Sequence, residues 1–124
     1  MKEKLTTENA PKADRILSQG LVINGTIYLS GQIHSQPDGT LVDGSTKEKL
    51  DCIMNNIQAI LGSADATLDD IIKVVIYVTD MAQMPELNEV YSTYFNGILP
   101  VREAVCVKGL PLGATIEISV VASK

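Results

Sequence analysis

A single tight hairpin constrains this sequence more than any other feature. Asn24-Gly25 stands between the aliphatic and β-branched runs Leu21–Ile23 and Thr26–Ser30. Asn-Gly accepts the positive φ values of a type I′ turn, and that turn matches the twist of two antiparallel strands. The segment 21–30 is therefore predicted to be a β-hairpin. A sheet that includes it needs another element to cover its apolar face.

Two helical patterns could supply that cover. Ser45 and Glu48 have the spacing of a capping box, and apolar residues then recur at helical spacing until Gly62, which predicts an amphipathic helix over 46–61. Pro85 suits a first helical position and begins a second pattern that is expected to end at Gly97. The side chains expected to be buried by the second helix are Leu87, Tyr91, Tyr94 and Phe95.

The remaining apolar runs predict strands near residues 71–79, 102–108 and 114–122, with a weaker strand near 2–6. With the hairpin, the order becomes β-β-β-α-β-α-β-β over a single domain, residues 1–124. This order predicts an α+β fold, in which one mixed sheet carries two helices on one face. The other face of the sheet is then left uncovered.

Side chains can be assigned to these faces if the last two strands pair as antiparallel neighbours. Alternation then places Val105 and Val107 on the helix-covered face together with Ile116, Ile118 and Val120. The same register places Arg102, Ala104 and Cys106 on the open face with Glu117. In the strand over 71–79, the side chains predicted to face the helices are Ile72, Val74, Ile76 and Val78. The open face keeps enough apolar surface to predict self-association.

Composition and charge exclude several function classes. The chain has 124 residues, 45% of them hydrophobic, and its ten basic against fifteen acidic residues give a net charge of -5. An acidic chain is a poor ligand for phosphate backbones, so no nucleic acid partner is expected. Residues 1–5 do not begin an apolar leader, and no apolar run is long enough to span a membrane. We therefore expect a cytoplasmic protein with no membrane partner.

Few residues are suited to metal or thiol chemistry. Cys52 and Cys106 are far apart and match no Cys-x-x-Cys spacing, so both are expected to be reduced thiols. His34 is the single histidine, and its place beside a predicted turn favours a surface position. No metal site is expected from this set, and no Gly-rich phosphate-binding loop occurs.

Arg102 and Glu117 are the charged pair best suited to chemistry. A guanidinium can grip both oxygens of a carboxylate with charge-assisted hydrogen bonds, and a partly desolvated carboxylate can orient water and move protons. The alternative is that the two simply form an ion pair across a subunit interface. Sequence alone does not decide between these interpretations.

Several short motifs together resemble one known family. They are Ser30-Gly31-Gln32-Ile33, Asn88-Glu89-Val90-Tyr91 with Tyr94-Phe95, Pro100-Val101-Arg102, Leu110-Pro111 and Ile116-Glu117-Ile118. In order and spacing they resemble the Rid family, also called the YjgF family of reactive-intermediate deaminases, over nearly the whole chain. The resemblance implies a chorismate-mutase-like fold and a homotrimer with a central β-barrel and active sites between subunits. It also implies hydrolysis of enamines and imines, such as 2-aminoacrylate and 2-iminopropionate, to 2-keto acids and ammonia without a cofactor.

Residue roles follow from the same resemblance. Arg102 matches the arginine that holds the substrate carboxylate, and Glu117 matches the glutamate that positions the attacking water. The matching substrate-binding positions also include Ser30, Gly31, Asn88 and Ala104, the last where many relatives have Cys. Leu17 stands where deaminating members usually have Tyr. A module that binds a keto acid without turnover is therefore the alternative function, and an endoribonuclease is a third.

Overall fold

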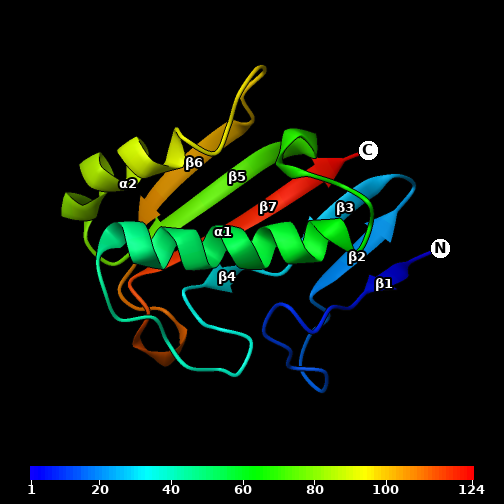
Figure 1. Ribbon diagram of the computed structural model, residues 1–124, viewed down its shortest axis with the longest axis horizontal. Coiled ribbons are helices and arrows are strands. Elements are labelled where there is room, and N and C mark those ends of the chain that lie inside the picture. Colours follow the sequence, from blue (N-terminus) through cyan, green and yellow to red (C-terminus); the bar gives the residue numbers. More distant parts are fainter.

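The capping box at Ser45 forms and begins the helix that covers the sheet. The Glu48 backbone N–H donates to Ser45 Oγ at 3.1 Å, and the Ser45 N–H donates to Glu48 Oε1 at 3.1 Å. Helix α1 then runs over Thr46–Gly62. The computed structural model describes all 124 residues, and in it α1 and the shorter α2, Met84–Tyr91, lie on the same face of one sheet (Figure 1).

The strands form one mixed sheet. Their bounds are β1 Glu3–Leu5, β2 Gly20–Ile23, β3 Thr26–Leu29, β4 Gln32–Ile33, β5 Ile71–Val78, β6 Val101–Cys106 and β7 Ile116–Ser123. The order across the sheet is β1-β2-β3-β7-β5-β6, and β4 also pairs with β7. All pairs are antiparallel except β5 with β6. Short 3₁₀ turns cover Leu68–Asp70, Met81–Gln83 and Pro111–Gly113. The predicted α+β architecture is confirmed, whereas β4 was not predicted.

The predicted hairpin is confirmed as β2 and β3. Asn24 and Gly25 have φ values of 49° and 82°, as a type I′ turn requires. Ile27 and Leu29 are buried under the helices, and Tyr28 lies on the open face with 48% of its surface exposed. The turn residues thus fix which face of the sheet each side chain of β3 joins.

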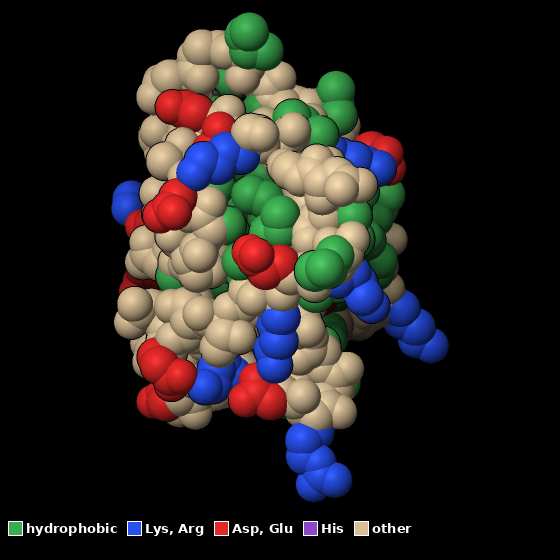
Figure 2. All heavy atoms as spheres, turned by 90° about the vertical axis from the view of Figure 1, so that its right-hand side faces the viewer, with side chains coloured by type: hydrophobic (Ala, Val, Ile, Leu, Met, Phe, Trp, Pro, Cys, Tyr) green, Lys and Arg blue, Asp and Glu red, His purple; other side chains and the backbone are tan.

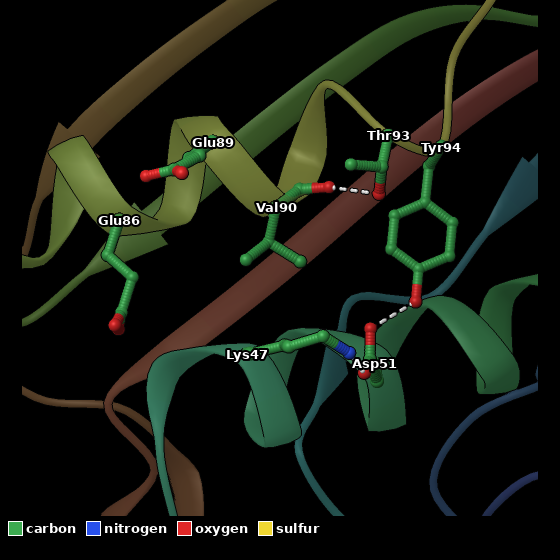
Figure 3. Close-up of a pocket in the computed structure, with 7 residues that line it drawn as sticks. All are labelled: Lys47, Asp51, Glu86, Glu89, Val90, Thr93 and Tyr94. Carbon is green, nitrogen blue, oxygen red and sulfur yellow. Dashed lines mark hydrogen bonds and ion pairs between the residues drawn. The ribbon is translucent and has the colours of Figure 1, made fainter.

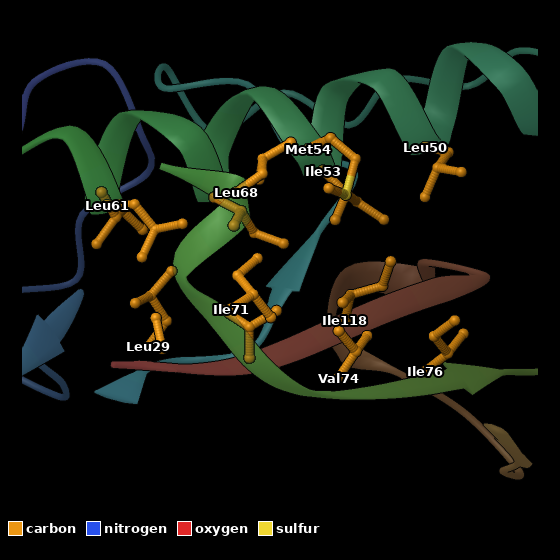
Figure 4. Close-up of a cluster of buried hydrophobic side chains, with 14 of the residues drawn as sticks. Leu29, Leu50, Ile53, Met54, Leu61, Leu68, Ile71, Val74, Ile76 and Ile118 are labelled. Atoms are coloured by element: carbon orange, nitrogen blue, oxygen red, sulfur yellow. The ribbon is translucent and has the colours of Figure 1, made fainter. Parts of the chain in front are cut away.

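The core lies between α1 and the sheet and is almost entirely aliphatic. Leu50, Ile53 and Met54 of α1 are at most 1% exposed, and they pack over the central strands (Figure 4). From the sheet, the side chains that meet the helices are Leu29, Val74, Ile76, Val78, Ile116, Ile118 and Val120. Full burial of one such side chain contributes about 1.5–3 kcal/mol to folding, so this layer fixes the position of α1 on the sheet.

The predicted pairing of the last two strands is wrong. Strand β6 pairs in parallel with β5, and β5 separates it from β7. The reason is α2, which joins β5 to β6, because parallel neighbours need a crossover connection that is usually a helix. The segment after β6 then passes β5 before β7 begins. Since β6 and β7 do not pair, the register from which the faces of their side chains were predicted does not occur.

This topology reverses the predicted faces of β6. Arg102, Ala104 and Cys106 lie beside Val74, Ile76 and Val78, which face the helices. Val105 lies beside Tyr77 on the open face and is 40% exposed, and Val101 on the same face is 68% exposed. The open face is therefore lined by valines where Arg102, Ala104 and Cys106 were expected.

Three smaller predictions also need correction. Ile72 is 49% exposed because a β-bulge between Ile71 and Lys73 shifts the alternation of β5. Helix α2 ends at Tyr91, before the expected Gly97.

His34 is 1% exposed where a surface position was expected. Its Nδ1 donates to the Val42 carbonyl at 2.7 Å, and its Nε2 accepts from the Thr115 N–H at 3.0 Å. Both ring nitrogens therefore serve to join two loops.

Candidate functional site

Glu117 lies on the open face at the start of β7, over a bulge in the neighbouring strand. Tyr28 is opposite Val121 and Gln32 is opposite Ile118, so four steps along β3 and β4 match three steps along β7. The extra residue falls at Ser30-Gly31. Bulges often occur beside active sites because they re-aim the local backbone. Here the bulge brings the Gly31 backbone under the Glu117 side chain.

The contact between Gly31 and Glu117 leaves no room for a side chain at position 31. A Cβ placed on Gly31 would lie 2.4 Å from Glu117 Oε2 and 3.0 Å from its carboxyl carbon. Glu117 is half-buried, and this burial raises the pKa of its carboxyl group above the usual value. A carboxyl group in such a position is suited to accept and return a proton.

Ser30 and Gln19 hold the loop beside Glu117. Ser30 Oγ donates to the Ser18 carbonyl at 2.6 Å, and the Ser30 N–H donates to the Gln19 carbonyl at 2.9 Å. The buried Gln19 Nε2 donates to the carbonyls of Thr7, Ala10 and Pro11. The Ser30 hydroxyl therefore positions the chain around Leu17, a role that its sequence motif does not reveal.

These segments enclose the Glu117 cavity, which we define as the hollow of about 320 Å³ on this side of the sheet. Its lining residues are Pro11, Lys12, Ala13, Leu17, Ser30, Gly31, Gln32, Ile33, Ser35, Gly39, Pro111, Leu112 and Glu117. Lys12 Nζ forms an ion pair with Glu8 at 2.6 Å, so its charge is already matched. Glu117 is the one carboxylate in this lining.

Arg102 lies in a second hollow, on the helix-covered side of the sheet. Its guanidinium carbon is 4.9 Å from the centre of the Tyr91 ring, in cation-π geometry. The Tyr91 ring is 4.7 Å from that of Phe95, so the cation rests on a packed aromatic pair. The Arg102 cavity has a volume of about 410 Å³ and is lined by Asn88, Tyr91, Ser92, Phe95, Leu99, Pro100 and Arg102.

The structure divides the predicted site residues into two groups. Ser30, Gly31 and Glu117 lie together, and Asn88 lies with Arg102. Within one chain, Arg102 and Glu117 face opposite sides of the sheet with β5 between their strands, so the predicted common face is wrong. Ala104 lines neither cavity and packs against the core. Each cavity therefore contains only part of the predicted set of site residues.

A third hollow, of about 660 Å³, lies between α1 and α2 (Figure 3). Lys47 Nζ pairs with Asp51 Oδ2 at 2.6 Å, and the Tyr94 hydroxyl donates to Asp51 Oδ1. Burial and this hydrogen bond raise the pKa of Tyr94. The polar groups at the centre of the hollow thus bond to one another, and the Tyr94 hydroxyl joins the segment that follows α2 to α1.

Sequence reasoning assigned Tyr91 to the core and missed its contact with Arg102. Asn88 and Tyr91 are three residues apart and therefore share one face of α2, which was the available signal. Sequence reasoning also missed Leu112, which lines the Glu117 cavity from the turn before β7.

For metals, no group of three or more His, Cys, Asp or Glu side chains is arranged to hold an ion. No helix is long and apolar enough to cross a membrane.

Comparison with known proteins identifies the family. A family model described as Endoribonuclease L-PSP matches residues 7–124. The chain belongs to the Rid family. Its fold matches the crystal structure of the Rid family protein YyfA from Yersinia pestis, with a TM-score of 0.96, 39% identity and full coverage of both chains. The Rid fold predicted from the motifs is therefore confirmed.

Two further relatives bear on function and location. A 2-iminobutanoate/2-iminopropanoate deaminase from Rattus norvegicus is 36% identical over 123 residues, covering 98% of this chain and 90% of the relative. Protein MMF1 of Saccharomyces cerevisiae, named as mitochondrial, is 37% identical over 118 residues, covering 95% of this chain and 81% of the relative. The name of the rat relative refers to imine deamination, and the name of the yeast relative refers to the mitochondrion. A cytoplasmic location of this chain therefore stays a prediction.

Proposed function

We propose that this protein hydrolyses small 2-imino acids to 2-keto acids and ammonia, at a site formed where the Glu117 cavity of one chain meets the Arg102 cavity of another. The observation that carries the proposal is the division of the two groups between opposite faces. Each group is incomplete alone, and an assembly of copies can bring a carboxylate and a guanidinium together. The rat relative named as an imine deaminase supports this reaction class.

The open sheet face supports self-association of the chain, and the family resemblance favours a homotrimer as the form it takes. Tyr28, Val101 and Val105 are 48%, 68% and 40% exposed on that face, although all three are large apolar side chains. Exposed apolar patches of this kind favour burial against another surface. A trimer has a mass of about three times 13.3 kDa, and light scattering at micromolar concentration measures it. A stable monomer contradicts the shared site.

In the proposed mechanism Arg102 orients the substrate. Its planar guanidinium rests on Tyr91, which leaves its N–H groups free to hold both oxygens of the 2-imino acid carboxylate. This grip presents the imine carbon to the opposite half of the site. Holding the reacting atoms in place lowers the entropic part of the barrier.

Glu117 then acts as general base toward the attacking water and as general acid toward the nitrogen. The Glu117 carboxylate accepts a proton from water as the water oxygen bonds to the imine carbon, and it returns that proton to the nitrogen. The carbon-nitrogen bond then breaks to release NH₃, and Glu117 transfers the remaining hydroxyl proton to it. R–C(=NH₂⁺)–COO⁻ and H₂O thus give R–CO–COO⁻ and NH₄⁺. The raised pKa of Glu117 favours this exchange, because a group that titrates nearer neutrality both takes and gives protons readily.

Two conservative substitutions test these roles. Arg102→Lys keeps the charge but loses the two-pronged grip, so the affinity for pyruvate should fall about 10- to 150-fold. Glu117→Gln should leave pyruvate binding nearly intact and lower the rate about 100-fold or more. The assay follows pyruvate and ammonia from freshly generated 2-aminoacrylate. The matched controls are Arg15→Lys and Glu86→Gln, which make the same chemical changes at exposed positions outside both cavities.

The same experiments separate a binding module from an enzyme. Leu17 supplies no hydroxyl to the Glu117 cavity, which is the feature that favours a module holding a keto acid without turnover. Such a module binds pyruvate in the parent and in Glu117→Gln but accelerates no hydrolysis. If Arg102→Lys binds and turns over like the parent, the carboxylate-anchor role is wrong.

Endoribonuclease activity is a weaker candidate, although the family description carries that name. The net charge is -5, and on the face shown in Figure 2 acidic and basic side chains are interspersed without a continuous basic patch. Binding to an RNA backbone draws most of its strength from basic surface. RNA cleavage by a nuclease-free preparation that is lost in Glu117→Gln would support this candidate over the deaminase.

A further inference from the structure

The turn before β7 contains an unusual residue at the Glu117 cavity. Leu112 has φ 59° and ψ 18°, and Gly113 follows with φ 76°. The Ala114 N–H donates to the Pro111 carbonyl at 3.0 Å. These are the features of a type I′ turn, in which both central residues have positive φ. For a residue such as Leu, the left-handed region costs about 1–2 kcal/mol.

The same chain builds another such turn with the residues that the geometry prefers. At the tip of the β2–β3 hairpin, Asn24 and Gly25 occupy the two positions that Leu112 and Gly113 occupy here. Asn tolerates positive φ far better than Leu does. The side chain of Leu112 is also 73% exposed, so burial in the core does not explain its presence. A strained residue of this kind points to a role at the adjacent site.

Leu112 is part of an apolar wall beside Glu117. Leu17, which is 43% exposed, Pro111 and Ile33 line the same cavity. The cation at the cavity, Lys12, forms an ion pair with Glu8 at 2.6 Å. An acidic substrate side chain would have to compete with Glu8 for Lys12, whereas an alkyl chain would bury apolar surface against the wall.

We infer that Leu17 and Leu112 form the pocket for the substrate side chain and that this pocket selects 2-imino acids with aliphatic side chains larger than methyl. This inference rests on the proposed function. The imine carbon is planar and carries a carboxylate, a nitrogen and a side chain. With the carboxylate on Arg102 and the water at Glu117, the side chain lies along the remaining wall of the Glu117 cavity.

The test compares imines that differ in the side chain. Imines of leucine and alanine are generated in situ by an amino acid oxidase, and semicarbazide traps whatever the protein has not hydrolysed. Each buried carbon is worth about fourfold, so kcat/KM for the leucine-derived imine should exceed that for the alanine-derived imine about 10- to 50-fold. An imine with an acidic side chain should be the poorest substrate. A parent that prefers the alanine-derived imine overturns the inference.

Leu112→Asn is the decisive variant, because it copies the residue of the hairpin turn. It relieves the unfavourable backbone conformation, so thermal stability should stay equal or rise. The preference for the leucine-derived imine should fall about fourfold or more, and Leu17→Ser should lower it as well. The control Ile98→Asn removes a fully exposed Ile outside the cavity and should leave the preference unchanged. An unchanged preference in Leu112→Asn overturns the inference even if the variant is more stable.

Binding of keto acids makes the result independent of catalysis. Calorimetry should show tighter binding of 4-methyl-2-oxopentanoate than of pyruvate, with the difference reduced in Leu112→Asn. If no imine is hydrolysed but this difference is found, the deaminase proposal is wrong and the side-chain pocket stands. If imines are hydrolysed without preference, the pocket assignment is wrong and the deaminase stands. If neither keto acid binds and no imine is hydrolysed, both are wrong.

Discussion

Gly31 and Glu117 share a space that holds the backbone of one and the carboxylate of the other, with no room for a Cβ between them. A methyl group added at Gly31 would lie 2.4 Å from Glu117 Oε2, closer than non-bonded atoms approach. The relationship depends on the one-residue bulge between β3 and β4. It fixes where the carboxylate can lie on the open face, and therefore where a water could be held.

Gly31→Ala should displace this carboxylate and slow the proposed reaction. A shift of about 1 Å in a reacting group can cost about 100-fold, so we expect a 10- to 100-fold loss of rate on the alanine-derived imine. The three atoms nearest to the added Cβ all belong to the Glu117 side chain and none to the backbone, so the free energy of unfolding should change by less than about 1 kcal/mol. The control is Gly62→Ala at the end of α1, where a Cβ meets nothing within 4 Å. A parental rate in Gly31→Ala would show that the carboxylate position is not critical.

Activity should be recovered when two inactive variants share one oligomer. Arg102→Ala chains keep the Glu117 half of the site, and Glu117→Gln chains keep the Arg102 half. Co-expression with two different affinity tags, followed by purification through both, yields trimers that contain both variants. In a cyclic trimer each mixed oligomer has one intact site, so about one third of parental activity is expected. Mixed oligomers as inactive as either variant alone would mean that no site combines the two halves across chains.

The ring of Tyr91, and not its hydroxyl, should support Arg102. The hydroxyl is buried without a hydrogen-bond partner, so Tyr91→Phe should leave stability equal or higher because no bond is lost. Tyr91→Leu removes the ring face under the guanidinium, and pyruvate affinity should fall about 2- to 5-fold. Titration calorimetry measures the affinities, and thermal unfolding monitors the fold. Equal losses in both variants would assign the effect to the hydroxyl.

Acid should weaken the fold through His34. Its pKa is below the usual 6.5, chiefly because burial disfavours the charged ring, and the charge of Lys49 acts in the same direction. The Val42 carbonyl and Asp43 oppose this shift. Since the unfolded chain binds the proton more tightly, stability is complete above about pH 6.5 and is lost as the pH falls toward the lower folded pKa.

His34→Gln tests this linkage by urea unfolding at pH 7.5 and pH 5. The variant should be less stable at pH 7.5 by about 1–3 kcal/mol, because it disturbs two buried hydrogen bonds. Its stability should also depend less on pH than that of the parent. If acidification lowers the stability of both proteins equally, another group accounts for the pH dependence.

Local chemistry determined the elements of this protein. Asn24-Gly25 requires a type I′ hairpin, and Ser45 with Glu48 begins α1 where the pattern predicts, because both signals act between residues close in sequence. The motifs around Gly31, Arg102 and Glu117 also sufficed to identify the family. These features depend on residue type and spacing, which are complete in the sequence.

Tertiary structure decided which strands are neighbours and therefore where the chemistry lies. Helix α2 carries the chain across the sheet, so β6 joins β5 in parallel and Arg102 faces the helices. One extra residue at Ser30-Gly31 shifts the register that places Gly31 under Glu117. A strand alternates its side chains strictly, so a single changed partner or extra residue moves a side chain to the other face. The choice of partner strand and register depends on how segments far apart in the sequence pack together, so it cannot be read from any short stretch of sequence.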